Sequence, residues 1–246
     1  MGAASIRVGC LLLIFPLGIG LAQAHTPVEF LEVVEVVPAQ LIEHDVELKT
    51  QLDNERVISN LEGPVFYSQA VGAMNRDRKK PVAYLNWFKI SNRRQEPTRN
   101  IETLDLIRGG ANKTLKIGSA EFLLSPAQRI TSGAPEAIPE GLDLYKAYRV
   151  LDSEAVGLEL TLTDANGDAD VTVGKPLFVC LPTSQWHHEE SILPSHPKDC
   201  LVVYEVSGTI PKSSYSTIDQ FGLNELSSGD RRLLCTRAAF LRMKSE

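Results

Sequence analysis

The sequence is poor in cysteine, methionine and tryptophan, and its charge balance is acidic. It contains 4 cysteines, 3 methionines and 2 tryptophans in 246 residues, and its formal net charge is −6 at pH 7. Proteins that bind nucleic acid favour a basic surface, so we expect no nucleic-acid partner. Only one run near the N-terminus approaches a membrane span, which needs about 20 apolar residues. We therefore expect no stable membrane insertion of the mature protein.

Signatures of common enzyme classes are also missing. The sequence has no G-x-S-x-G nucleophile elbow, no phosphate-binding loop, no dinucleotide fingerprint and no Cys-x-x-Cys pair. No convincing amphipathic helix emerges from the periodicity of its apolar residues. These absences favour a protein that is not an enzyme, and they leave metal sites as the chemistry to consider.

The apolar run over residues 8–21 predicts an export signal. Arg7 supplies the positive charge before it, and the Ala-Gln-Ala that ends at Ala24 has the small-x-small pattern of a cleavage site. Cleavage there would remove residues 1–24 as a signal peptide. His25 would then be the first residue of a periplasmic or secreted protein.

The remaining chain contains a repeat of about 56 residues. Repeats of fixed period are units that need their neighbours to bury their apolar faces. Within each unit a short hydrophobic segment comes first, and a second hydrophobic run closes the unit. The opening segments read FLEVVEV, YLNWFKI, LYKAYRV and CLVVYEV, and they begin at Phe30, Tyr84, Leu144 and Cys200.

The pattern within the repeats is typical of β-strands. Residues 158–164 alternate apolar and polar side chains, as a half-buried strand does, and Asn166-Gly167 is a preferred hairpin turn. We therefore predict an all-β protein of four degenerate repeats. We expect them to form sandwich- or barrel-like halves over residues 25–126 and 142–240, with a four-bladed propeller as the alternative.

Several short motifs of the last two repeats follow a recognisable order. They are Tyr145-Lys-Ala-Tyr148, Val173-Gly-Lys-Pro176, Val179-Cys-Leu-Pro182, Ile218-Asp-Gln-Phe-Gly222 and Leu234-Cys235. They resemble a family of secreted bacterial β-repeats of unknown function, whose pattern is Y-x-C-Y, T-D-Q-F-G, V-G-K-P and L-C-x-P. The resemblance implies an extracytoplasmic module without a known activity. Ala147 and Val203 stand where that family has the first cysteine of each copy, so its covalent link cannot be carried over.

Three cysteines remain after the predicted cleavage, namely Cys180, Cys200 and Cys235. An oxidising compartment favours a disulfide, and the odd count leaves one thiol over. Cys180 with Cys200 would close the proline-rich connection between the last two repeats. Cys200 with Cys235 would instead staple the last repeat, and the sequence leaves both pairings open.

Asp164, Asn166, Asp168 and Asp170 place oxygen ligands at alternate positions, as the start of a calcium loop does. Lys175 stands where the bidentate glutamate of an EF-hand loop would be, and the other repeats lack this series. A hairpin turn with solvated acids therefore competes with a calcium site. We predict no cofactor, with calcium as the alternative.

A second metal hypothesis rests on the predicted processing. The amine and imidazole of His25 would chelate copper at a new N-terminus, which resembles secreted copper oxygenases. Such a site needs a second inward histidine, drawn from His44, His187, His188 and His196.

Three functions follow from the sequence. The preferred one is a non-catalytic binding or structural module with an unknown protein or glycan partner. The second is a calcium-stabilised or carbohydrate-binding module. Trp186 would be an exposed contact residue for a sugar or a partner. The third is a copper-dependent oxidoreductase that uses His25.

Overall fold

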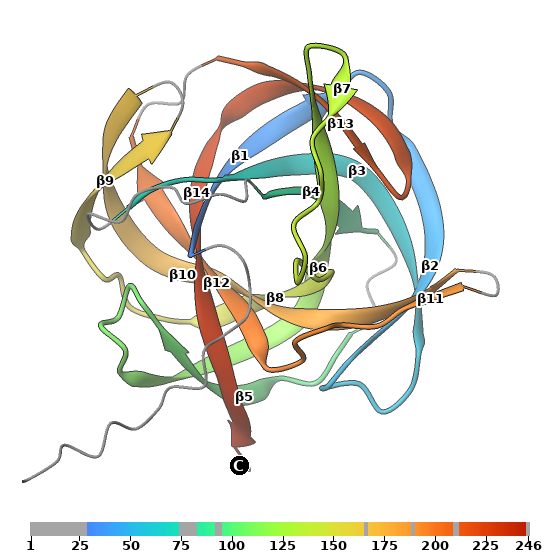
Figure 1. The fold of residues 1–246 in the computed structure, drawn as a ribbon. Helices are drawn as coiled ribbons and strands as arrows, with labels where there is room; N and C mark the ends of the chain where they lie inside the picture. Colours follow the sequence, from blue (N-terminus) through green and yellow to red (C-terminus); the bar gives the residue numbers. More distant parts are fainter. Residues whose placement is uncertain are drawn as a thin grey trace, which may run out of the picture.

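The computed structural model describes residues 29–73, 83–91, 95–164, 167–187, 190–208 and 212–244. The described chain forms fourteen strands in one sheet, which confirms the all-β prediction (Figure 1). None of the described segments forms a helix that is long and apolar enough to cross a membrane.

The sheet consists of four copies of the same three-strand unit. A short opening strand is followed by a second strand and by a long third strand, and the four opening strands coincide with the predicted repeat starts. The repeat prediction is therefore confirmed. The units are β1 (Phe30–Pro38), β2 (Ile42–Thr50) and β3 (Val57–Ala70); β4 (Tyr84–Ile90), β5 (Arg99–Asp105) and β6 (Asn112–Thr131); β8 (Tyr145–Asp152), β9 (Leu158–Asp164) and β10 (Gly167–His187); and β12 (Asp199–Ser207), β13 (Ser214–Asp219) and β14 (Gly222–Lys244). Two short strands, β7 (Ala134–Pro135) and β11 (Glu190–Ile192), pair with the ends of β6 and β10.

The opening and long strands of the four repeats pair in a closed ring. Each opening strand lies between two long strands, and every pairing is antiparallel. The order is β1, β3, β4, β6, β8, β10, β12 and β14, and β14 pairs again with β1. Strands of both predicted halves, residues 25–126 and 142–240, therefore belong to one continuous sheet. A propeller would instead need a separate sheet for each repeat.

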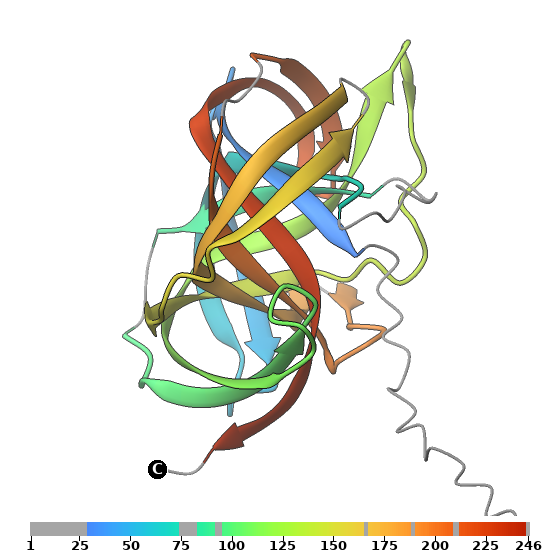
Figure 2. The same ribbon diagram turned by 90° about the vertical axis from the view of Figure 1, so that its left-hand side faces the viewer.

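The second strands fold back as hairpins that connect opposite repeats. Each pairs with the first part of its own long strand. Three of them also pair with the far end of the long strand two repeats away, as β2 does with β10, β5 with β14 and β13 with β6. For β9 the corresponding contact is a bridge between Thr163 and Gly72, just after β3. In Figure 2 the hairpin of β9 and β10 crosses the ring strands at an angle.

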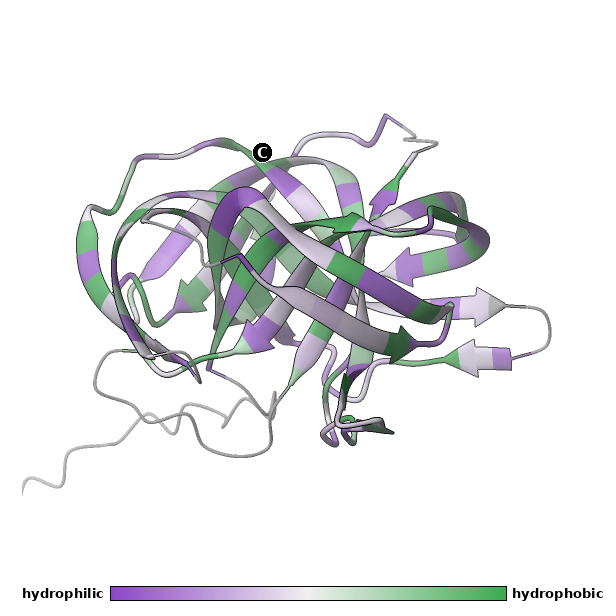
Figure 3. Cartoon of the chain, turned by 90° about the horizontal axis from the view of Figure 1, so that it is seen from above, coloured by the Kyte–Doolittle hydropathy of each residue, from purple (hydrophilic) through white to green (hydrophobic). Residues whose placement is uncertain are grey.

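Both faces of the ring strands are buried, which explains their nearly continuous apolar runs. One face forms an inner cluster made almost wholly of ring-strand residues, such as Leu31, Trp87 and Tyr145. The other face forms an outer cluster, in which ring residues such as Tyr204 pack with hairpin residues such as Leu48. The hairpin strands bury one face only, so their side chains alternate between hydrophobic and hydrophilic, as Figure 3 shows along several strands.

Each long strand carries a glycine where the next ring strand passes closely. The register between β1 and β14 shifts between Val34 and Val36, opposite Gly229, and a Cβ on Gly229 would lie 3.0 Å from Glu35 Cγ. Gly63 has φ +139°, and a Cβ there would lie 2.9 Å from the Val65 nitrogen. Bulges of this kind bend a strand and permit a close approach of backbones.

Candidate functional site

Each hairpin carries an aspartate at or just after the end of its second strand. These aspartates are Asp53, Asp105, Asp164 and Asp219. All four lie within hydrogen-bond distance of a ring-strand side chain two repeats away, and for Asp164 this side chain is Gln69 near the end of β3. The aspartates therefore mark four equivalent places where a hairpin docks on the ring. We call these places the docking sites.

At two docking sites the aspartate accepts hydrogen bonds from neutral or cationic donors. Asn86 Nδ2 donates to Asp219 Oδ2 at 2.7 Å, and burial raises the pKa of Asp219 above the usual range of a carboxyl group. Tyr204 donates to Asp105 Oδ2 at 3.0 Å, and Arg108 Nε donates to the same oxygen at 2.6 Å. Burial also raises the pKa of the Tyr204 hydroxyl.

The docking site of Asp53 contains a buried amine. Lys146 on β8 lies between Asp53 and Glu96, and all three side chains are nearly buried. The Thr50 side chain contacts the Tyr148 hydroxyl at 2.8 Å, and burial raises the pKa of that hydroxyl. The site therefore holds the Lys146 amine between two carboxylates, and Arg99 Nη1 also lies 3.4 Å from Glu96 Oε2.

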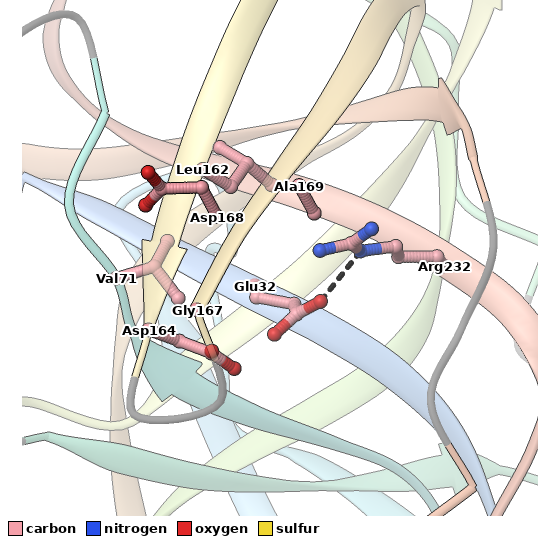
Figure 4. Close-up of a pocket in the computed structure, with 8 residues that line it drawn as sticks. All are labelled: Glu32, Val71, Leu162, Asp164, Gly167, Asp168, Ala169 and Arg232. Carbon is pink, nitrogen blue, oxygen red and sulfur yellow. Dashed lines mark ion pairs between the residues drawn. The ribbon is translucent and has the colours of Figure 1, made fainter.

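The docking site of Asp164 borders a cavity of about 70 Å³ (Figure 4). Two of its lining residues form an ion pair: Arg232 Nε lies 2.5 Å from Glu32 Oε1, and the two side chains point toward one another. Gln69 Nε2 donates to Glu32 Oε2 at 3.3 Å and to Asp164 Oδ2 at 3.4 Å. The cavity is lined by Glu32, Val71, Leu162, Asp164, Gly167, Asp168, Ala169 and Arg232.

The predicted calcium ligands lie on both faces of one hairpin. Thr163 and Thr161 stand opposite Asp168 and Asp170, and their hydroxyls donate to those carboxylates at 2.8 and 2.7 Å. Asp164 lies on the other face, because side chains alternate along a strand. Asn166 lies outside the described residues. Within the described ranges, no group of three or more His, Cys, Asp and Glu side chains is arranged to hold a metal ion.

The histidines of the copper hypothesis are placed only in part. His25 and His188 lie outside the described residues, and His187 is the last residue of β10. His44 on β2 stacks on Phe221, with ring centroids 4.9 Å apart. The remaining one, His196, belongs to the connection between β11 and β12. The structure therefore does not test the copper site.

The three cysteines are free and buried, so the disulfides expected from the sequence are absent among them. Cys180 belongs to the inner cluster and pairs with Leu201, whereas Cys200 belongs to the outer cluster. Neighbouring positions of a strand face opposite sides, so Cys180 and Cys200 face away from each other. Burial raises the pKa of all three thiols.

Trp186, the predicted contact for a sugar, already packs against another side chain of the same chain. The Arg56 guanidinium lies 4.1 Å above the ring of Trp186 and covers one of its faces. Another cavity, of about 430 Å³, is lined mainly by polar and acidic groups of β2 and β3. Its residues are Glu43, His44, Asp45, Asn60, Leu61, Glu62 and Ser91.

Sequence reasoning singled out Asp164 as a calcium ligand and included Asp219 in a repeat motif, but it missed what the two side chains contact. It also missed Lys146, Asp53 and Glu96. The available signal was Lys146 itself, a charged residue inside the apolar segment LYKAYRV. Such a residue in a buried strand indicates a buried partner.

A comparison with known families places the repeat. Neither the curated proteins nor the solved structures contain a match to this chain. A family model described as a repeat of unknown function (DUF7450) matches residues 84–237, from the start of β4 into β14. This range covers well over half of the chain and includes three of its four opening strands. The chain therefore belongs to the DUF7450 family of repeats of unknown function.

Proposed function

We propose that this protein is an exported, non-catalytic repeat module with a structural or binding role. The observation that supports this proposal is the use of its repeated polar residues. Asp53, Asp105, Asp164 and Asp219 all make contacts that hold a hairpin against the ring. Residues that recur in every repeat thus serve the assembly of the fold.

The state of the cysteines also favours a role without catalysis. A cysteine nucleophile acts as a thiolate and needs a lowered pKa and some exposure. Cys180, Cys200 and Cys235 are buried, and burial raises the pKa of each. They serve as small apolar residues of the core.

A binding role would use the outside of the ring. The cavity of about 430 Å³ is lined by the carboxylates of Glu43, Asp45 and Glu62, of which Glu62 also pairs with Lys89 at 3.6 Å, and this acidic lining suits a cationic group. This lining favours a protein partner with basic side chains over a neutral sugar. We propose that such a partner is met in the periplasm or outside the cell, after removal of residues 1–24.

Metal analysis of the processed protein tests the proposal. The protein is expressed with its signal, its N-terminus is determined by mass spectrometry, and copper and calcium are measured together with the His25→Ala and Asp164→Ala variants. Copper lost from His25→Ala, with copper-dependent turnover, would replace the proposal by the oxidoreductase. Calcium lost from Asp164→Ala would replace it by the calcium-stabilised module. Metal-free protein whose unfolding is unchanged by a chelator is the expected result.

A further inference from the structure

Lys146 is the one lysine that is almost fully buried within the described part of the chain. Its side chain is 2% exposed, and the side chains of Asp53 and Glu96 are 6% and 11% exposed. Lys146 Nζ lies 3.3 Å from Asp53 Oδ2 and 3.1 Å from Glu96 Oε1. An amine is thus held against a carboxyl group, with a second carboxylate beside it.

This arrangement occurs at one docking site of the four. The aspartates at the other three meet Tyr204 with Arg108, Gln69, or Asn86. At these sites a phenol, an amide or a guanidinium donates a hydrogen bond to the aspartate. The site of Asp53 alone therefore combines a primary amine with two carboxylates.

Burial makes the ionic form of this site costly. Removing an ammonium and carboxylates from water carries a large desolvation cost, which their mutual attraction only partly offsets. An amide bond between the amine and one carboxyl group removes both charges of that pair. The enclosed setting therefore favours the condensed form more than water would.

We propose that Lys146 and Asp53 form an intramolecular amide bond, with Glu96 as the proton carrier. Glu96 accepts a proton from the Lys146 ammonium, and the nitrogen lone pair then attacks Asp53 Cγ. The new C–N bond forms, and the C–Oδ1 bond breaks. Of the three ammonium protons one stays on the amide nitrogen, and two leave with Oδ1 as water by way of Glu96. Atoms and charges balance without an oxidant or a second substrate.

The groups around Asp53 match this step. The Thr50 backbone N–H and hydroxyl donate to Asp53 Oδ2 at 2.9 and 3.0 Å. Donors in this position stabilise the negative charge that develops on Oδ2 during the attack. Tyr148 contacts the Thr50 hydroxyl at 2.8 Å and fixes its orientation. The amine is already in place, so the reaction has the advantage of proximity.

The water that leaves has a space to enter. A cavity of about 210 Å³ borders both carboxyl groups, Asp53 and Glu96. It opens between the turn after β2 and the segment before β5, where Val57 and Arg99 also line it. The released water can therefore depart without a rearrangement of the ring.

The bond would join two parts of the chain that are 93 positions apart. It would tie the first hairpin to the ring strand of the third repeat. The described cysteines form no disulfide, so the amide would supply the covalent staple that they do not. The inference does not depend on export, because both partners belong to the folded chain.

Mass spectrometry of the full, denatured protein tests the bond. We expect a mass lower by one water than the processed sequence predicts, and a branched peptide after digestion that joins Asp53 to Lys146. Lys146→Arg keeps the charge and should show the full mass. Asp53→Asn should lose ammonia in place of water, because the amide nitrogen is then the leaving group. Glu121→Gln, which removes a carboxylate 3.9 Å from Arg149, is the matched control and should retain the deficit.

The wild-type result decides the proposal. Folded wild-type protein at full mass, after prolonged incubation, would overturn it. A water deficit that persists in Lys146→Arg would also overturn it, because the loss would then arise elsewhere. Glu96→Gln should remain folded by circular dichroism and uncondensed, and a branched peptide in this variant would refute the role of Glu96.

Discussion

The buried ion pair of Glu32 and Arg232 gives the sharpest prediction about stability. Both side chains are 5% exposed, and Arg232 Nε lies 2.5 Å from Glu32 Oε1. Arg232→Met would leave the Glu32 carboxylate buried with Gln69 as a remaining donor. Loss of one partner of a buried pair costs about 3–5 kcal/mol. A typical domain has a free energy of unfolding of about 5–15 kcal/mol, so the loss is a large fraction of it.

Replacing both charges should behave differently. Glu32→Leu combined with Arg232→Met leaves no uncompensated charge, and such replacements are often neutral or stabilising. We expect the double variant to unfold near the wild-type urea concentration. Fluorescence of Trp87, which is buried in the inner cluster, reports the transition.

An exposed pair provides the control for this measurement. Arg242 is 69% exposed and contacts Glu102 at 2.8 Å, so Arg242→Met should cost less than about 1 kcal/mol. If Arg232→Met lowers the free energy of unfolding no more than the control does, the buried pair does not stabilise the fold. If the double variant shows the sum of both single losses, the losses come from packing and the electrostatic account is wrong.

Three further predictions follow from the same structure. Burial raises the pKa of Asp219, so folding favours its protonated form, and its contribution to stability is lost as pH rises through the raised pKa. In Asp219→Asn the free energy of unfolding in urea should therefore change less with pH over this range, and an unchanged pH dependence would refute the assignment. The free thiols should react with a thiol reagent only after unfolding, because burial raises the pKa of Cys180, Cys200 and Cys235, and rapid labelling of native protein would contradict this. Gly63→Ala should lower the free energy of unfolding by about 1–3 kcal/mol because of the positive φ and the crowded Cβ position. Gly133 also has a positive φ but open space around its Cβ position, so Gly133→Ala should cost less. Equal losses in the two variants would exclude crowding as a cause.

The strands could be predicted from the sequence because their signals are local. The segment at Tyr84 predicted β4, and the structure buries both faces of this strand. Ring closure could not be predicted in this way. The pairing of β1 with β14 joins Phe30 to Thr236, and no short segment encodes a contact between the two ends of the repeat array.

The candidate site was harder to predict because its contacts are long-range. The acidic series around Asn166-Gly167 looked like a metal loop when it was considered alone. The hairpin register places Thr163 opposite Asp168, and this separates Asp168 from Asp164 by face. The alternation rule would have given that separation once the turn was fixed. By contrast, the contact of Asp53 with Lys146 needs the arrangement of four repeats, which the sequence did not provide.

One position in the repeat explains how the hairpins are matched to the ring. The third residue of each opening segment is Glu32, Asn86, Lys146 or Val202, and all four are buried. Asn86 and Lys146 meet Asp219 and Asp53 directly. Glu32 pairs with Arg232 of the ring and shares the donor Gln69 with Asp164 of the β9 hairpin. Where Val202 stands, the polar contact moves two residues along the strand to Tyr204, which meets Asp105.

The docking sites thus differ in chemistry while the backbone arrangement is kept. A hairpin placed at the wrong site would bury Asp53 against Glu32, or Asp219 against Val202. Like charges or an unpaired carboxylate in an enclosed site cost free energy that correct pairing avoids. The divergence of the repeats at this position therefore specifies which hairpin docks where. A chain of four identical repeats would lack that specification.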